Sequence, residues 1–253
     1  MRNRALKDLT GRHDAACHLV CFPYGGGGPS TFRTWPAGLP RQAGVWAANL
    51  AGREGRFAEP PLTDLRQQVE ELAAAVRPLS DRPLVLFGAS LGATLAAHVA
   101  QEIFPAMSAP ATLVVAARRA PWSPSPPSRR FAHLPDADFL DALAEGGGID
   151  TRVRNSPELL ELVMPVLRAD AHLAEAEQYV KEKALNGCVH GFYGLADAAV
   201  DRAETEQWQR FTTGTFQAVG IEGGHFFATT RQADMLSHLR RILTGSLSSP
   251  SIP

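Results

Sequence analysis

The 253-residue sequence has few cysteines and no long apolar run. Its three cysteines, Cys17, Cys21 and Cys188, form neither a disulfide framework nor a zinc-binding pattern. No apolar stretch could cross a bilayer, and the basic N-terminus lacks the apolar region of a signal peptide. The net charge of −1 gives no general attraction to nucleic acid or to acidic membranes. We therefore expect a cytoplasmic protein that uses no metal and binds neither nucleic acid nor membrane. A monomer is expected, although no residue pattern sets the oligomeric state.

Short apolar runs alternate with helical patterns along the chain. Strands are expected near residues 17–22, 45–50, 84–87, 112–117, 187–194 and 216–221. Helical patterns occupy 62–76, about 201–211 and about 231–244, and the alternation favours an α/β fold with a mostly parallel sheet between two helical layers. A chain of this length fits one large domain, which we place at 16–245, between a flexible N-terminus (1–15) and a flexible tail (246–253).

Residues from about 119 to 185 interrupt this alternation. A proline-rich segment is followed by three helical stretches, near 136–146, 156–168 and 170–183, for which Asp136 and Ser156 are N-cap candidates. An all-helical insertion either packs beside the sheet without a role in catalysis or covers the active site as a lid. Because connections at the carboxyl ends of parallel strands overhang the ligand crevice, we favour a lid.

The stretch Leu84–Gly92 joins a buried apolar run to a helix made of small residues. It carries the pattern Gly-x-Ser-x-Gly at Gly88, Ser90 and Gly92. In a nucleophile elbow the serine occupies a sharp turn between a strand and a helix, and the glycines allow these two elements to approach closely. The alternative is a surface turn that contains a serine. The strand before the motif and the helix after it favour Ser90 as the nucleophile.

Four consecutive glycines, Gly25 to Gly28, follow the first expected strand. They indicate either a flexible turn or a backbone that must approach a ligand closely. The Gly-Lys-Ser/Thr ending of a phosphate-binding loop is missing. In an α/β-hydrolase a loop at this place supplies one N–H of the oxyanion hole, and the residue after the nucleophile supplies the other. We therefore expect the N–H groups of Gly25 and Leu91 to form an oxyanion hole.

Ser90, Asp197 and His225 each follow an expected strand, in the chain order of an α/β-hydrolase triad. Loops at one edge of a parallel sheet can bring such residues together. The imidazole would take the serine proton, and the carboxylate would fix its tautomer. Asp201 is a rival acid, although its position suits a helix N-cap. A lone histidine is often structural, but His225 lies between two glycines and two phenylalanines, as expected beside an apolar pocket.

Several motifs, in this order, resemble those of type II thioesterases that accompany modular polyketide and nonribosomal peptide synthetases. They are Phe22–Gly27, Gly52–Glu54 with Arg56 and Glu59, Pro165–Asp170, Gly194–Asp197 with Trp208, and Gly223–Phe227. The sequence departs from the family pattern at four places, where Ala51, Ala89, Leu91 and Ala198 replace Pro, His, Met and Pro. These changes leave the expected triad intact. They therefore bear on substrate preference and rate and not on the type of reaction.

The resemblance implies an α/β-hydrolase with a helical lid. It also implies an editing enzyme that hydrolyses acyl thioesters from the phosphopantetheine arm of an acyl or peptidyl carrier protein. The arm would arrive with the substrate, so no cofactor is expected. Four arginines near the lid could dock an acidic carrier: Arg129, Arg130, Arg152 and Arg154. The alternatives are an esterase or acyltransferase acting on free esters or acyl-CoA, and a non-catalytic partner of a synthase.

Overall fold

The computed structural model describes residues 4–12, 14–123, 130–176 and 184–248. At its centre is a seven-stranded sheet with the order β1-β3-β2-β4-β5-β6-β7. The strands are β1 (Leu6–Asp8), β2 (Cys17–Phe22), β3 (Ala43–Ala48), β4 (Leu84–Ala89), β5 (Ala111–Ala116), β6 (Cys188–Gly194) and β7 (Phe216–Ile221). All neighbouring pairs are parallel except β1 with β3. This arrangement confirms the mostly parallel α/β fold.

Strand β1 corrects the expectation that residues 1–15 are flexible throughout. Leu6 pairs with Ala48 and Asp8 with Trp46, so this short segment extends the sheet beyond β3. None of its three residues is fully buried. A half-exposed strand of this length has no hydrophobic pattern by which the sequence could reveal it.

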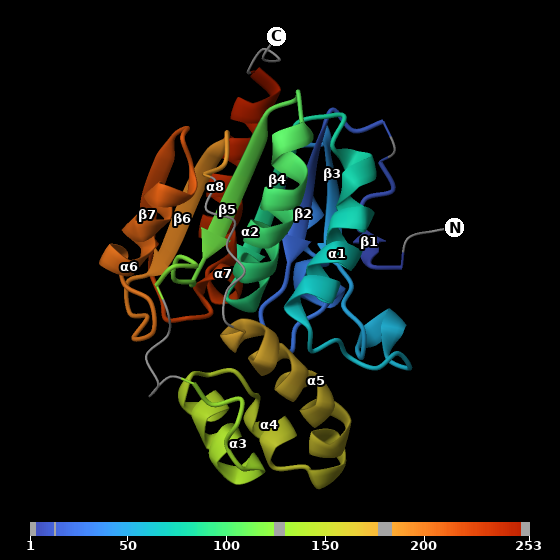
Figure 1. Ribbon diagram of the computed structural model, residues 1–253, viewed down its shortest axis with the longest axis vertical. Coiled ribbons are helices and arrows are strands. Elements are labelled where there is room, and N and C mark those ends of the chain that lie inside the picture. The colour runs from blue at the N-terminus through green and yellow to red at the C-terminus, as the bar shows by residue number, and fades with distance from the viewer. Residues whose placement is uncertain (1–3, 13, 124–129, 177–183, 249–253) are drawn as a thin grey trace.

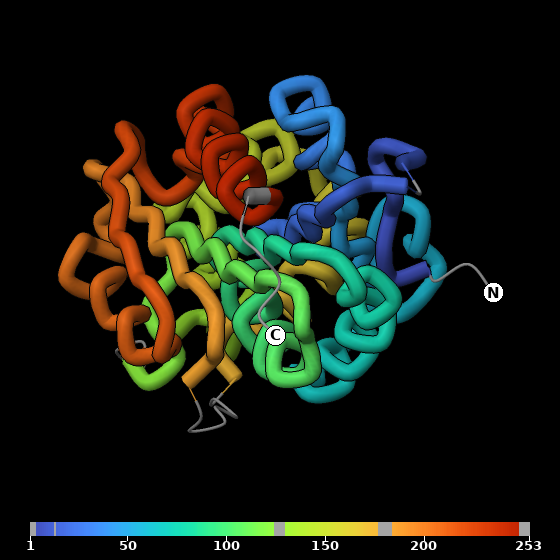
Figure 2. Tube along the Cα trace, turned by 90° about the horizontal axis from the view of Figure 1, so that it is seen from above, coloured from blue at the N-terminus to red at the C-terminus, as the bar shows by residue number. Residues whose placement is uncertain are grey.

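Helices cover both faces of the sheet (Figure 1). The helices α1 (Leu65–Val76) and α2 (Leu91–Ile103) lie on one face, and α7 (Phe227–Thr230) and α8 (Gln232–Ser248) lie on the other. Figure 2 shows α8 and the α1–α2 pair on opposite sides of the strands. Side chains of β4 alternate between the two cores, because successive strand residues point to opposite faces.

The C-terminal helix extends beyond its expected end near residue 244, so the flexible tail does not begin at 246. The hydroxyls of Thr244 and Ser246 donate to the carbonyls of Arg240 and Ile242, one turn earlier in the helix. These bonds satisfy the two hydroxyl groups within the helix, which continues to Ser248. Near β6 and β7, the expected helix at 201–211 is α6 (Arg202–Glu206) followed by a 3-10 helix, Gln207–Phe211.

The insertion lies beyond the end of the sheet where the parallel strands finish (Figure 1). It contains α3 (Asp136–Glu145), α4 (Thr151–Arg154) and α5 (Pro157–Glu175). Ser156 caps α5 as expected, through a hydrogen bond from the N–H of Leu159, whereas Pro135 and not Asp136 is the N-cap of α3.

The two helices expected at 156–168 and 170–183 are one continuous helix as far as Glu175. The sequence suggested a break near Ala169, but Ala169 and Asp170 are both buried, so contacts with the rest of the protein hold the helix intact there. Pro165 lies inside this helix. Residues 177–183 of the expected second helix, and 124–127 of the proline-rich segment, fall outside the described residues.

Within the described part of the chain, no helix has both the length and the apolar character needed to span a membrane.

Candidate active site

Ser90 occupies a sharp turn between β4 and α2. Its φ of 51° and ψ of −117° lie outside the regions that side-chain-bearing residues ordinarily adopt. A Cβ on Gly88 would come within 2.1 Å of the carbonyl oxygen of Gly92, and one on Gly92 equally close to that of Phe22. The two glycines therefore allow the close strand–helix contact that the strained turn requires, and the geometry is that of a nucleophile elbow.

The side chains of Ser90, His225 and Asp197 form a hydrogen-bonded chain. Nε2 of His225 lies 3.1 Å from Oγ of Ser90, and Nδ1 lies 2.9 Å from Oδ2 of Asp197. An ionised carboxylate only accepts hydrogen bonds, so Nδ1 carries the proton and Nε2 is left to accept from the serine hydroxyl. The structure thus brings together the three residues that the sequence singled out, in the relation that base-assisted nucleophilic attack requires.

Asp197 is placed by the loop after β6, which packs on the loop after β7. The N–H of Ala196 donates to the carbonyl of Gly223, and this bond joins the acid loop to the histidine loop. The Asp197 side chain is only 1% exposed and also accepts the N–H groups of Ala199 and Val200. Burial opposes ionisation, but these bonds and the contact with His225 outweigh it and lower the pKa of Asp197 below its ordinary value.

The rival carboxylate, Asp201, serves a different purpose. Its side chain accepts the N–H of Glu204, and the Glu204 side chain accepts the N–H of Asp201. This reciprocal pair is a capping box that begins α6. Asp201 is therefore committed to a helix terminus, and Asp197 is the carboxylate that accepts the hydrogen bond from Nδ1 of His225.

The two expected oxyanion donors lie in the loop after β2 and at the start of α2. Leu91 is the first residue of α2, where N–H groups have no acceptor within the helix. Gly25 lies in a tight turn closed by a 2.9 Å hydrogen bond from the N–H of Gly27 to the carbonyl of Tyr24. Their role in binding an oxyanion stays a prediction.

Arg53 and Asp170 lie beside this turn. Both belong to motifs that carry the family resemblance, but the sequence alone assigns neither of them a role. The guanidinium of Arg53 donates to both carboxylate oxygens of Asp170, at 2.6 and 2.8 Å. The same carboxylate accepts the N–H of Gly26 at 2.7 Å. Asp170 belongs to α5 of the insertion, which we call the lid (α3 to α5), so this contact joins the lid to the glycine loop.

Aromatic and small side chains surround the nucleophile. The rings of Tyr24 and Phe226 meet edge to face with centroids 5.1 Å apart. On the lid side, a Cβ at Gly147 would lie 3.6 Å from the ring of Phe226. A pocket at this place is lined by Tyr24, Ala89, Ser90, His225, Phe226, Ala228 and Thr229. The reacting hydroxyl is therefore next to an apolar wall that includes a residue at which the chain departs from the family pattern, Ala89.

Two of the four arginines considered for docking a partner form ion pairs with acidic neighbours. Arg152 forms an ion pair with Asp150, and Arg154 forms one with Asp141. Arg129 falls outside the described residues. These pairs reduce the positive charge that the lid can offer to an acidic surface.

The sheet order, the elbow and the Ser–His–Asp chain define an α/β-hydrolase. The sequence pattern of the thioesterase domain family matches residues 17–243, and the chain belongs to that family. This assignment agrees with the resemblance noted from the motifs.

Comparisons with individual proteins show which members of the family the chain resembles. The chain is 33% identical, over 238 residues, to "Linear gramicidin dehydrogenase LgrE" of Brevibacillus parabrevis, covering 92% of this chain and 90% of that protein. That name refers to a redox activity, whereas the family match and the site are those of a hydrolase. Thioesterase PikA5 of Streptomyces venezuelae is 33% identical, over 85% of this chain and 76% of its own. The solved type II thioesterase BorB, from the borrelidin biosynthetic cluster, superposes with a TM-score of 0.82 at 28% identity, covering 96% and 97%.

Proposed function

We propose that this thioesterase edits a modular synthase by hydrolysing acyl thioesters from the phosphopantetheine arm of an acyl or peptidyl carrier protein. The hydrogen-bonded chain Ser90–His225–Asp197 at the elbow carries the proposal. The likeness to BorB, a type II thioesterase of a biosynthetic cluster, supports the class of substrate. The proposed partner is the carrier protein, and the phosphopantetheine belongs to that substrate.

The first half of the reaction transfers the acyl group to the enzyme. Nε2 of His225 takes the proton of Ser90 as Oγ attacks the thioester carbonyl carbon. The carbonyl oxygen becomes an oxyanion that the N–H groups of Gly25 and Leu91 stabilise. When the carbon–sulfur bond breaks, the imidazolium returns its proton to the departing thiolate. Asp197 is ionised throughout and stabilises the imidazolium.

The second half releases the acid. His225 takes a proton from a water molecule as its oxygen attacks the acyl-serine carbonyl, and the same N–H groups hold the second oxyanion. Collapse of this intermediate breaks the bond to Oγ, which recovers its proton from His225. The apolar wall formed by Tyr24 and Phe226, under the lid, is the proposed place for the acyl chain.

Intact-mass analysis of a panel of acyl-carrier proteins tests this proposal. The wild type is expected to return acyl-loaded carriers to the free thiol form, and Ser90→Ala is expected to leave them loaded. Parallel assays with free acyl-CoA and simple esters separate an editing enzyme from a small-molecule esterase. A wild type that hydrolyses the free esters but leaves every loaded carrier intact would contradict the carrier-protein assignment.

Labelling by a serine-directed fluorophosphonate separates catalysis from a purely structural partnership. The proposal requires stoichiometric labelling of Ser90 in the wild type and none in Ser90→Ala. An unlabelled wild type would favour a non-catalytic partner of the synthase.

A further inference from the structure

The ion pair between Arg53 and Asp170 is almost completely removed from solvent. The side chains are 8% and 2% exposed. Both oxygens of Asp170 bind Arg53, and Oδ2 also accepts the N–H of Gly26. Arg53 in turn donates to the carbonyl of Gly27. The pair therefore holds two consecutive residues of the glycine loop, directly after the expected oxyanion donor Gly25.

Helix α5 reaches this loop through three neighbouring side chains. A Cβ on Gly26 would lie 2.9 Å from Leu167, and one on Gly52 would lie 3.0 Å from Val166. Both glycines have positive φ, at 79° and 85°. The lid helix thus packs directly on the turn that carries Gly25 and on the loop that carries Arg53, with Asp170 one turn further along.

The glycine turn needs such an anchor because its residues have little conformational preference of their own. The peptide plane between Gly25 and Gly26 is rigid, so holding the N–H of Gly26 fixes the orientation of that plane. The N–H of Gly25 is separated from that plane by the Cα atom of Gly25. Its orientation relative to the plane therefore varies only with φ and ψ of Gly25. An uncompensated carboxylate at this place would disfavour a nearby oxyanion, and the bidentate contact with Arg53 neutralises it.

We infer that Arg53 and Asp170 are positioning residues that set the oxyanion hole and make it depend on the seating of lid helix α5. The inference rests on the proposed hydrolytic function. When α5 is seated, Asp170 holds Gly26 and the donor Gly25 is in place. When α5 moves away, the turn loses this acceptor. The lid would therefore control both access to Ser90 and the readiness of the site.

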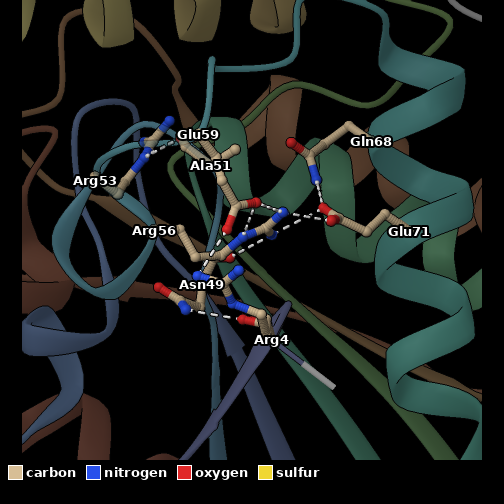
Figure 3. Close-up of polar contacts among 8 residues, drawn as sticks. All are labelled: Arg4, Asn49, Ala51, Arg53, Arg56, Glu59, Gln68 and Glu71. Atoms are coloured by element: carbon tan, nitrogen blue, oxygen red, sulfur yellow. Dashed lines mark hydrogen bonds and ion pairs between the residues drawn. The ribbon is translucent and has the colours of Figure 1, made fainter. Parts of the chain in front are cut away.

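A purely structural pair would behave differently, and nearby residues provide a control. Arg56, on the same loop, binds Glu59 and also Glu71, which is on α1. The Arg53 guanidinium lies apart from this cluster (Figure 3). Glu71→Gln weakens a buried-arginine contact without touching the glycine turn. Replacing a buried ion pair by apolar residues of similar size often preserves stability. The double variant Arg53→Met/Asp170→Leu is therefore designed to remove the anchor, and its thermal midpoint shows whether the fold is kept.

The test compares kcat, KM, thermal midpoint and the rate of Ser90 phosphonylation in four proteins: the wild type, Asp170→Asn, the double variant and Glu71→Gln. Loss of a whole oxyanion donor lowers kcat by about 10²–10³-fold. In Asp170→Asn and in the double variant, the N–H of Gly25 is displaced but still present. The loss of kcat should therefore be smaller, about 10- to 100-fold. KM should change less than about threefold, phosphonylation should slow in parallel with kcat, and Glu71→Gln should match the wild type.

A double variant that phosphonylates Ser90 at the wild-type rate would overturn the inference, and so would an equal slowing in Glu71→Gln. Phosphonylation does not depend on which thioester is the natural substrate. An active wild type whose anchor variants are unimpaired therefore contradicts the inference alone. A wild type that neither hydrolyses loaded carriers nor reacts with the probe contradicts the proposed function itself.

Discussion

The sheet-based body and the helical lid differ sharply in how well their elements are buried. In the body, α2 buries twelve of its thirteen residues between the sheet and α1. In the lid, α3 buries only Phe139, and no residue of α4 is buried. Helix α5 has its buried residues in its second half, from Val166 to Leu173, where it meets the glycine loop. The lid is thus held mainly at one end.

This difference separates the chemistry from its control. Ser90, Asp197 and His225 all come from loops of the body, where two large cores fix the ends of the strands. The lid contributes an anchored contact to the site, through Asp170. Regions with few buried apolar contacts are those that open at low free energy. We therefore expect substitutions in the body to act on the reaction itself or on the whole fold, and substitutions in the lid, apart from those of the anchor Asp170, to act locally.

The largest effect is expected at Asp197. In Asp197→Asn the side chain no longer fixes the His225 tautomer or stabilises the imidazolium, and kcat should fall by about 10⁴-fold. Asp201→Asn is the matched control, because Asp201 caps α6 and its loss should cost about 1 kcal/mol or less of stability. Steady-state hydrolysis of an acyl thioester measures both variants. Comparable kcat losses in the two would contradict the assignment of the acid.

The body and its site could be predicted because their signals are local in the sequence. The elbow is encoded within Leu84–Gly92, and the topology of a parallel sheet then places the loops after β4, β6 and β7 at one edge. Asp197 could be ranked above Asp201 because one follows a strand and the other precedes a helix.

The lid contact could not be predicted in the same way. Arg53 and Asp170 are 117 positions apart, and the motif containing each gave no sign that they form a pair. A buried aspartate in the middle of a helix has no periodic signature, because only its partner explains it. Strand β1 escaped detection for a related reason, since its pairing with β3 and not its composition makes it a strand.

The next largest effect is expected from Phe139→Ala, which tests whether the lid opens independently. Phe139 is fully buried in a small lid core, where its ring is tilted against that of Phe131 and lies under the guanidinium of Arg168. Its truncation should cost about 3–5 kcal/mol. Hydrogen exchange should then show lost protection in residues 136–175, while β2 and β4 stay protected.

Phe192→Ala provides the comparison from the body. Phe192 lies on β6, is 1% exposed, and its ring meets the ring of His238 on α8 edge to face. Its truncation should lower the midpoint of global unfolding and reduce protection throughout the sheet. If Phe139→Ala instead produced the same uniform loss of protection, the lid and the body would unfold as one unit, and the separation drawn above would be wrong.

A smaller, pH-dependent effect is expected within the body. Burial, and then the charge of Arg118, lower the pKa of His98 to about 4, and its Nε2 has no hydrogen-bond partner among the described residues. The unfolded chain binds a proton near pH 6.5, whereas the folded protein does not until about pH 4. The stability present above pH 6.5 is therefore lost as the pH falls from 6.5 towards 4, by about 3 kcal/mol in total.

Denaturant unfolding of the wild type and His98→Gln, at pH 7 and pH 4.5, measures this contribution. The variant should lose less stability than the wild type between the two pH values. Equal losses would show that His98 is not the group responsible. The same pH change should leave hydrogen exchange in the lid helices less affected than in α2, because His98 lies on α2.

The smallest effect is expected from reversing the charge of Arg152 on the lid. Arg152 and Asp150 are both exposed, and such pairs contribute about 0–1 kcal/mol. Because Asp150 already balances the arginine, Arg152→Glu should change kcat/KM for an acyl-carrier protein by less than about threefold, even at low salt. A tenfold loss confined to carrier-bound substrate, with Ser90 phosphonylation unchanged, would show that the lid docks the carrier electrostatically. The lid would then take part in recognition as well as in positioning the glycine loop.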